Sequence, residues 1–252
     1  MLLSTVLLAL VASPLVAAHG KIAVVTGDQG GNTTALGIKG GIVPGAGPNS
    51  RTEVDTTVFK STKIATDGLG KTKAGGENTL DGISDVIAQS GSTFPQVSSD
   101  GGSVSGTYHI VTTDGAGPLS AIIEPTGTGA FSQGTEAEVV TQVPGRKGEI
   151  AAPKQRSLFT RALVRVGLVK RAQNVNEDYP FKVAIPAGTT CSGTVGGQSN
   201  VCLLKVANPS PAGPFGGVFA FQMAGTSANS SAGTASSSAA SGSALVARRF
   251  SA

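Results

Sequence analysis

Tryptophan is absent from the 252 residues of this chain, and histidine, cysteine and tyrosine each occur only twice. With Tyr108 and Tyr179 as its only tyrosines, the sequence offers little of an aromatic platform on which sugar rings could stack. It also lacks a GxSxG motif, the cysteine spacing of a zinc site and any nucleic-acid-binding motif. The sequence therefore gives no support to the corresponding hydrolase, zinc-binding or nucleic-acid-binding classes.

Long apolar runs are also scarce, because the only one covers Leu2 to about Val16. A bilayer takes ~20 apolar residues, so this run is too short, and the small residues Val16-Ala17-Ala18 after it are typical of a signal-peptidase site. We expect a signal peptide over residues 1–18, a mature chain that begins at His19, and a soluble protein that is secreted and extracellular or cell-wall associated. The alternative interpretation is a buried or interfacial apolar segment.

Positive charge is concentrated in one segment, since residues 146–171 hold eight Lys or Arg and a single acid, Glu149. The rest of the chain is acidic on balance, so the basic pI describes this segment and does not indicate nucleic-acid binding. We expect a basic insert at about 145–176 between two strands. Three interpretations stay open: a solvated disordered loop, a loop cleaved at the dibasic pair Lys170-Arg171, or an amphipathic helix at a membrane surface.

Short runs rich in Val, Thr and Ile, bounded by some of the 36 glycines, predict an all-β fold. We expect an immunoglobulin-like β-sandwich with long loops over residues 19–224, a short helix near 80–89 and a disordered Ser/Ala/Gly-rich tail over 225–252. The predicted strands are 20–26, 104–113, 118–124, 136–143, 180–185, 200–207 and 216–223.

Two cysteines, Cys191 and Cys202, lie on either side of a Gly-rich turn. In a secreted chain an even pair predicts a disulfide, and two free thiols are the alternative. The sequons at Asn32 and Asn229 are compatible with glycosylation.

The two histidines, His19 and His109, suggest metal chemistry. If cleavage occurs before His19, its α-amine and ring nitrogen can chelate one ion, and a second imidazole completes a three-nitrogen set that suits Cu(II). His109 is the candidate second ligand, because strand alternation puts it on the face opposite Tyr108 and Ile110, where a surface site could form. The pattern resembles the histidine brace of copper lytic polysaccharide monooxygenases. The alternative is a surface histidine without a ligand role.

A copper site often has an axial neighbour, and the run 216–222 offers candidates. Phe219 and Phe221 share one face and could shield the axial side, with Gln222 as a hydrogen-bond donor near the metal. The alternative is that both phenylalanines belong to the core.

Several stretches resemble the secreted fungal appressorium-specific proteins of the Egh-like virulence-factor family. They are AHGKI at 18–22, ALGI at 35–38, VDTTVFK at 54–60, FPQVSSDGG at 94–102, YHIVTTDGAGP at 108–118 and FKVAIPAGTTCSGTVGGQSNVCLLKVANPSPAGPFGGV at 181–218. The resemblance implies a secreted protein associated with infection structures and virulence. This chain departs from it by having fewer cysteines and by the basic insert.

Three functional hypotheses follow from these residues. The first is a copper-dependent enzyme that oxidises a cell-wall polysaccharide of host or fungus. The second is a copper-binding or wall-associated protein without turnover. The third is a structural or effector protein without a metal.

Overall fold

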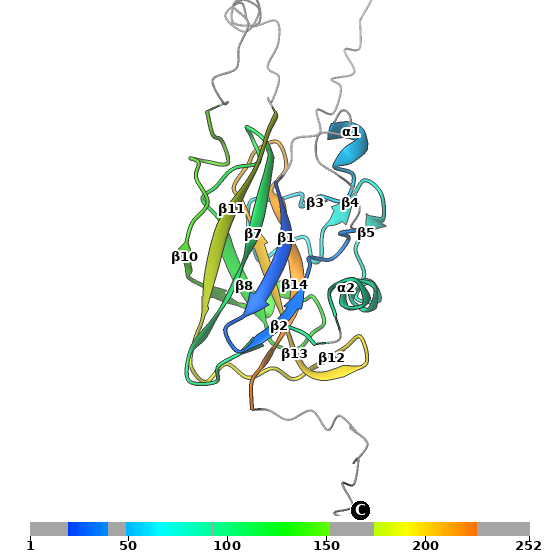
Figure 1. Cartoon of the computed structure of the whole chain (residues 1–252), viewed down its shortest axis with the longest axis vertical. Helices are drawn as coiled ribbons and strands as arrows, with labels where there is room; N and C mark the ends of the chain where they lie inside the picture. The colour runs from blue at the N-terminus through cyan, green and yellow to red at the C-terminus, as the bar shows by residue number, and fades with distance from the viewer. Residues whose placement is uncertain (1–19, 40–48, 92, 152–173, 226–252) are drawn as a thin grey trace, which may run out of the picture.

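The computed structural model describes residues 20–39, 49–91, 93–151 and 174–225, which form two packed sheets with both helices on one side (Figure 1). The expected signal peptide, His19, the centre of the basic insert with Lys170-Arg171, and the tail beyond 225 lie outside the described residues. In chain order the elements are β1 Gly20–Gly27, β2 Gly30–Thr33, α1 Asn49–Thr52, β3 Thr57–Val58, β4 Lys71–Thr72, β5 Gly76–Glu77, α2 Gly82–Ser90, β6 Gln96–Val97, β7 Gly102–Thr112, β8 Ser120–Glu124, the 3-10 helix η1 Phe131–Gln133, β9 Thr135–Ala137, β10 Val139–Thr141, β11 Asn174–Ile185, β12 Gly193–Val195, β13 Gln198–Ala207 and β14 Phe215–Met223.

The first sheet is antiparallel throughout and has the order β10-β11-β7-β1-β2. Its central strand, β7, is 11 residues long and pairs with β1 on one side and β11 on the other. The predicted strands at 20–26 and 104–113 are confirmed. The strand predicted at 180–185 begins earlier, at Asn174, so the last part of the expected insert is paired sheet.

The second sheet has the order β5-β4-β3-β14-β13-β8-β9, with β12 added to β13 and β6 added in parallel to β14. The strands predicted at 118–124, 200–207 and 216–223 are confirmed. The single strand predicted at 136–143 is wrong, because β9 pairs with β8 in this sheet whereas β10 pairs with β11 in the first. The chain passes from the second sheet to the first at Glu138. Polar and apolar residues alternate in the same way before and after this residue, so the sequence gives no sign of the change.

The main core lies between the two sheets and includes Ile22, Tyr108 and Phe181 from one sheet and Leu204 and Phe219 from the other. A second apolar cluster covers the outer face of the second sheet. It draws on Phe59, Ile83, Phe94, Phe131, Leu203 and Val218. Because both faces of this sheet are covered, β14 is buried at all nine residues, which explains its nearly continuous apolar sequence.

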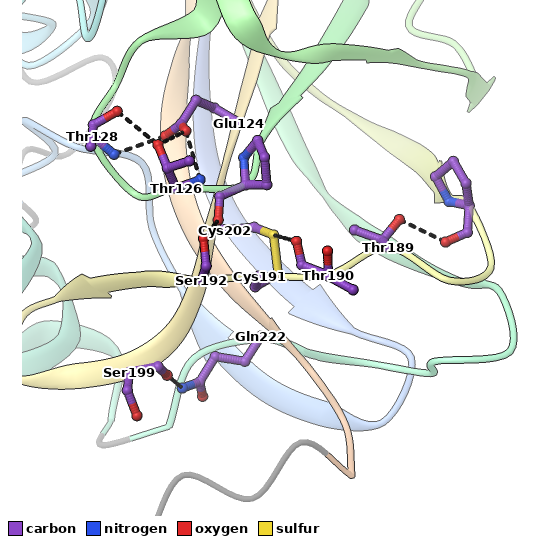
Figure 2. The surroundings of a disulfide bond; sticks show 12 residues. Glu124, Thr126, Thr128, Thr189, Thr190, Cys191, Ser192, Ser199, Cys202 and Gln222 are labelled. Atoms are coloured by element: carbon purple, nitrogen blue, oxygen red, sulfur yellow. Dashed lines mark hydrogen bonds between the residues drawn. A yellow bond between two sulfur atoms is a disulfide. The ribbon is translucent and has the colours of Figure 1, made fainter.

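The predicted disulfide between Cys191 and Cys202 is present, with the two α-carbons 4.9 Å apart (Figure 2). It closes the hairpin of β12 and β13. The two turn residues, Gly196 and Gly197, have φ of 58° and 76°, a conformation that glycine adopts without strain and that favours a two-residue hairpin turn.

Glu124 ends β8 close to this disulfide and is fully buried (Figure 2). Its carboxylate accepts hydrogen bonds from the backbone N–H groups of Thr126 (2.7 Å), Thr128 (2.9 Å) and Gly129 (3.1 Å), and from the Thr126 hydroxyl. Both oxygens are therefore satisfied, and the loop after β8 is folded around the carboxylate.

Candidate metal centre

His109 lies on β7, the central strand of the first sheet, directly opposite Lys21 of β1 and Asp178 of β11. Residues directly opposite one another in antiparallel strands have their side chains on the same face. The three residues therefore form a row on the outer face, while Tyr108 and Ile22 point into the core. The face predicted for His109 is the face that the structure gives it.

His109 is not the surface residue that we expected, because only 6% of it is exposed. Alternation predicts which face a side chain takes, but it does not predict what packs over that face. Close to this row, the acidic segment that follows α1 meets Lys21, and Asn49 of α1 donates a hydrogen bond to Asn174 of β11 at 3.0 Å. Figure 1 shows α1 beside the end of the sheet where β1 begins.

The imidazole of His109 is held in one orientation by its Nδ1, which is 2.6 Å from Oδ1 of Asp178. An ionised carboxylate can only accept, so Nδ1–H donates this hydrogen bond, and in the neutral tautomer with this proton on Nδ1 the lone pair is on Nε2. Nε2 is buried and has no hydrogen-bond partner among the described residues. Metal-binding histidines commonly have this arrangement, with one ring nitrogen on a carboxylate and the other available to the metal.

A second polar group adjoins the row on the side of β1. The Lys21 ammonium lies 2.6 Å from Oε2 of Glu53 and 3.2 Å from Oδ1 of Asp55. Both carboxylates are almost completely buried, with Glu53 2% and Asp55 1% exposed. Asp55 also accepts a hydrogen bond from the backbone N–H of Lys39 at 3.4 Å.

β1 begins at Gly20, which pairs with Ile110, the residue after His109. A Cβ atom at Gly20 would lie 2.1 Å from the Tyr108 hydroxyl oxygen and 2.4 Å from the Gly115 carbonyl oxygen, so only glycine fits there. His19, the other expected ligand, precedes Gly20 in the chain and lies outside the described residues. In the described part of the chain no three His, Cys, Asp or Glu residues are grouped so that they could hold a metal.

The three expected neighbours of the metal lie elsewhere. Phe219 and Phe221 are fully buried in the core between the sheets. Gln222 donates to the Ser199 carbonyl oxygen at 2.7 Å and accepts from Gln96 at 2.9 Å (Figure 2). Gln222 lies near one end of β14. The carbonyl of Phe215, at the other end, accepts a hydrogen bond from the Tyr108 hydroxyl, and at ~3.3 Å per residue Gln222 and Phe215 are about 23 Å apart along the strand. Alternation correctly groups the two phenylalanines on one face, but it gives no position relative to His109.

Of the two predicted glycosylation sites, Asn32 lies exposed on the edge strand β2, and its side-chain oxygen accepts a hydrogen bond from Thr26 at 2.9 Å. Asn229 lies outside the described residues. Glycosylation at either residue stays a prediction.

Asp178, Glu53 and Asp55 have no role in the sequence-based predictions. Asp178 lies 69 residues from His109 in the chain, and only the register of β7 with β11 brings them together. Glu53 and Asp55 belong to a segment without regular periodicity. The sequence held one indication of these acidic partners: Lys21 is a charged residue in a predicted strand, and a buried lysine normally has an acidic partner.

Comparison with known proteins identifies the family, because the model of the Egh16-like virulence factor family matches residues 17–216. The chain belongs to this family. The Egh16-like protein is 35% identical over 218 residues to "Appressoria-specific virulence factor GAS1" of Pyricularia oryzae, a match that covers 86% of this chain and 76% of that protein. It is 28% identical over 274 residues to "Appressoria-specific virulence factor GAS2" of the same species, covering 86% and 88% of the two chains.

The family matches the resemblance predicted from the sequence. In the part of this Egh16-like chain that the structure describes, no helix is long and apolar enough to cross a membrane. The disulfide and the homology to fungal virulence factors are both consistent with export to an oxidising compartment.

Proposed function

We propose that this Egh16-like protein is secreted, acts in infection and binds copper through the α-amine and ring of His19 together with Nε2 of His109. Homology to appressoria-specific virulence factors supports the first two statements. One observation carries the third: the buried Nε2 of His109 has no hydrogen-bond partner among the described residues, although Asp178 fixes the ring through Nδ1. A buried nitrogen lone pair without a partner is costly, and a metal ion would relieve that cost.

The pairing of β1 with β7 supports His19 as the other ligand. Gly20 is paired with Ile110, so a mature chain that starts at His19 starts one residue from the strand pair beside His109.

The chemistry of the donor set fits Cu(II), since two imidazoles and an amine are nitrogen ligands. Bound copper would supply one-electron redox chemistry. The protein's own contribution is to keep the proton on Nδ1 of His109 through Asp178, and to present Nε2 in a fixed orientation. The amine must lose its proton to bind, so affinity is expected to fall at acid pH.

Calorimetry and electron paramagnetic resonance with Cu(II) test the proposal on protein whose sequenced N-terminus is His19. We expect one tight site with a nitrogen-rich spectrum. His19→Ala and His109→Ala should each lower affinity by at least about 100-fold. A matched control carries one extra residue before His19, which keeps both imidazoles but moves the amine, and it should also bind weakly.

The proposal fails if His109→Ala binds Cu(II) as tightly as the unaltered protein, or if the secreted chain begins at a residue other than His19. In either case the protein would be a structural or effector protein without this metal.

Two activities are compatible with a copper site: oxidation of a cell-wall polysaccharide of host or fungus, and binding without turnover. The second is favoured by the tyrosines, because Tyr108 is fully buried, leaving Tyr179 as the only tyrosine with any exposed surface. Oxidised products after incubation of the copper-loaded protein with a reductant and a panel of glycans would establish the first. Copper binding with no products from any glycan would favour the second.

The strand order also supports an immunoglobulin-like sandwich as the scaffold. The order β1-β7-β11-β10 in one sheet corresponds to strands A, B, E and D of that fold, and β14-β13-β8-β9 corresponds to G, F, C and C′. The proposed copper site then lies at the start of strand A, where maturation of the chain creates the amine.

A further inference from the structure

We propose that Asn32 carries an N-linked glycan whose first sugar covers the exposed Val24 on the outer face of the first sheet. The sequence supplies the acceptor as Asn32-Thr33-Thr34, with the hydroxyl residue that the modification needs two positions after the asparagine. The proposal rests on the proposed secretion of the protein, because N-glycans are added in the secretory pathway, and it does not depend on copper.

The folded chain leaves the side-chain nitrogen of Asn32 accessible. Asn32 is exposed on the edge strand β2, directly opposite Thr26 of β1. The Thr26 hydroxyl donates to Oδ1 of Asn32 at 2.9 Å, whereas Nδ2 has no hydrogen-bond partner among the described residues. Nδ2 is therefore the atom of this amide that is free to bear a substituent. A glycan attached before folding can stay in place without breaking the bond to Thr26.

The reaction joins Asn32 to an oligosaccharide that is delivered as a lipid-linked glycosyl diphosphate. A bond forms between Nδ2 and C1 of the first sugar, and the bond between C1 and the diphosphate oxygen breaks. Nδ2 loses one proton, and the lipid diphosphate leaves. The product keeps one N–H on Nδ2 and also keeps the carbonyl oxygen that accepts the hydrogen bond from Thr26.

Val24 lies on the same face as Asn32 and close to it. Val25 is fully buried in the core between the sheets, so Val24 faces outward, and 48% of it is exposed. Thr26, two residues after Val24, is directly opposite Asn32. Val24 is therefore the diagonal neighbour of Asn32 across the strand pair, at ~7–8 Å. A sugar on Nδ2 begins within reach of this valine.

The face around Val24 is open. Its neighbours along the row are Thr107 of β7, which is half-buried, and Pro180 of β11, which is exposed. In Figure 1 both helices lie to the side of β1 and β7 and not in front of them. The first sugar of an N-glycan presents C–H groups and an acetyl methyl, which can remove the apolar surface of a valine from water.

The glycan and the candidate metal centre occupy different parts of this face. Asn32, Thr26 and Ser105 form one row across β2, β1 and β7. Ser105 and His109 are four residues apart on β7, which corresponds to ~13 Å. We therefore expect copper affinity to be the same with and without the glycan. A glycosylated protein that does not bind copper would refute only the copper site.

Mass spectrometry of the full chain secreted from a fungal host tests the attachment. The protein carries Asn229→Gln, which removes the other sequon, and is treated with an endoglycosidase that leaves one N-acetylglucosamine. This sugar should mark the peptide that contains Asn32. Thr34→Ala should remove the mark, whereas Thr34→Ser, the matched control, should retain it because it keeps a hydroxyl.

Secreted protein with an unmodified Asn32 would overturn the proposal. Retention of the chain inside the cell would instead refute the secretion on which the proposal rests.

Hydroxyl-radical footprinting tests the contact with Val24. Val140 is the matched control, because it is 49% exposed and lies on β10, the opposite edge of the same sheet, ~19 Å from β2 at the usual strand spacing. In Thr34→Ala, Val24 should be oxidised about twofold faster than in the glycosylated protein, because the sugar no longer covers apolar surface. Val140 should be oxidised at the same rate in both.

The unaltered protein trimmed to one sugar provides a second measurement that needs no substitution near the strand. It should keep the slow oxidation of Val24, because the first sugar makes the contact. Fast oxidation of Val24 in the glycosylated protein, or equal acceleration of Val24 and Val140 in Thr34→Ala, would overturn the proposed cover.

Discussion

Glu124 and Glu53 are two fully or almost fully buried glutamates at opposite ends of the sandwich, and their surroundings differ. Glu124, close to the disulfide, accepts three backbone N–H groups and a hydroxyl. Glu53, beside the start of β1, has an ammonium nearby but no hydrogen-bond donor in good geometry among the described residues. Buried polar groups are normally satisfied, so the first arrangement indicates a structural role, whereas the second leaves a buried carboxylate without a hydrogen-bond donor among the described residues.

The largest expected effect is at Glu124. Glu124→Ala would leave three buried N–H groups without an acceptor and a cavity in the loop after β8. We expect the free energy of unfolding to fall by about 4 kcal/mol, measured by urea denaturation. Copper affinity should not change. A loss below about 1 kcal/mol would show that the two glutamates differ less than their hydrogen bonds indicate.

Removing the disulfide by replacing Cys191 and Cys202 with serine should have the next largest effect. The bond links residues 11 apart in sequence, and a loop of this size stabilises a fold by about 3 kcal/mol or less. Denaturation of the reduced and oxidised natural protein provides a check without mutation. We expect copper binding to be unchanged, because the disulfide and the proposed copper site lie at opposite ends of the sandwich. Loss of copper binding together with the disulfide would contradict this expectation.

Asp178→Asn tests the other end of the molecule. The Asp178 side chain is 67% exposed, so its loss should change the free energy of unfolding by less than about 0.5 kcal/mol. It should nevertheless weaken Cu(II) binding by about 10- to 100-fold, because the ring of His109 is no longer held with its proton on Nδ1. Unchanged affinity would show that Asp178 does not orient the ligand.

The smallest effect concerns Lys205, a buried cation on the outer face of the second sheet. Its ammonium donates to the Thr66 carbonyl oxygen and lies 4.1 Å from the centre of the Phe59 ring and 5.3 Å from that of Phe131. Burial lowers the pKa of Lys205 to about 8. Between pH 8 and the ordinary lysine pKa, the unfolded chain binds this proton and the folded chain does not, so stability rises with pH.

We therefore expect Lys205 to add about 1 kcal/mol to the free energy of unfolding between about pH 7 and pH 9. Lys205→Met should remove this dependence, whereas the exposed Lys71→Met should leave it in place. Identical pH profiles for the unaltered protein and Lys205→Met would show that the group titrates as it does in water.

Much of the fold could be predicted from local patterns. The runs that form β13 and β14 and the Cys-flanked hairpin carry their signals within a few adjacent residues, and the structure confirms them. The division of 136–143 between two sheets could not be predicted, because the turn at Glu138 leaves the alternation intact.

The candidate site was less predictable than the fold. Alternation gave the face of His109, but its partner Asp178 depends on the register between strands that are distant in sequence. Glu53 and Asp55 meet Lys21 only because the chain after α1 turns back to β1. Gln222, chosen because it shares a run with two phenylalanines, bonds instead with Gln96 and Ser199. Contacts of this kind are set by tertiary geometry, which local periodicity does not encode.

Gly20 has a practical consequence for any recombinant preparation. With the Tyr108 hydroxyl 2.1 Å from where a Cβ would be, even alanine at this position would push the first strand away from its neighbour. A recombinant protein must therefore keep Gly20, and a test of the proposed copper site also needs a chain that begins at His19. Cloning scars or affinity tags left at this end would alter the very residues whose chemistry is to be measured.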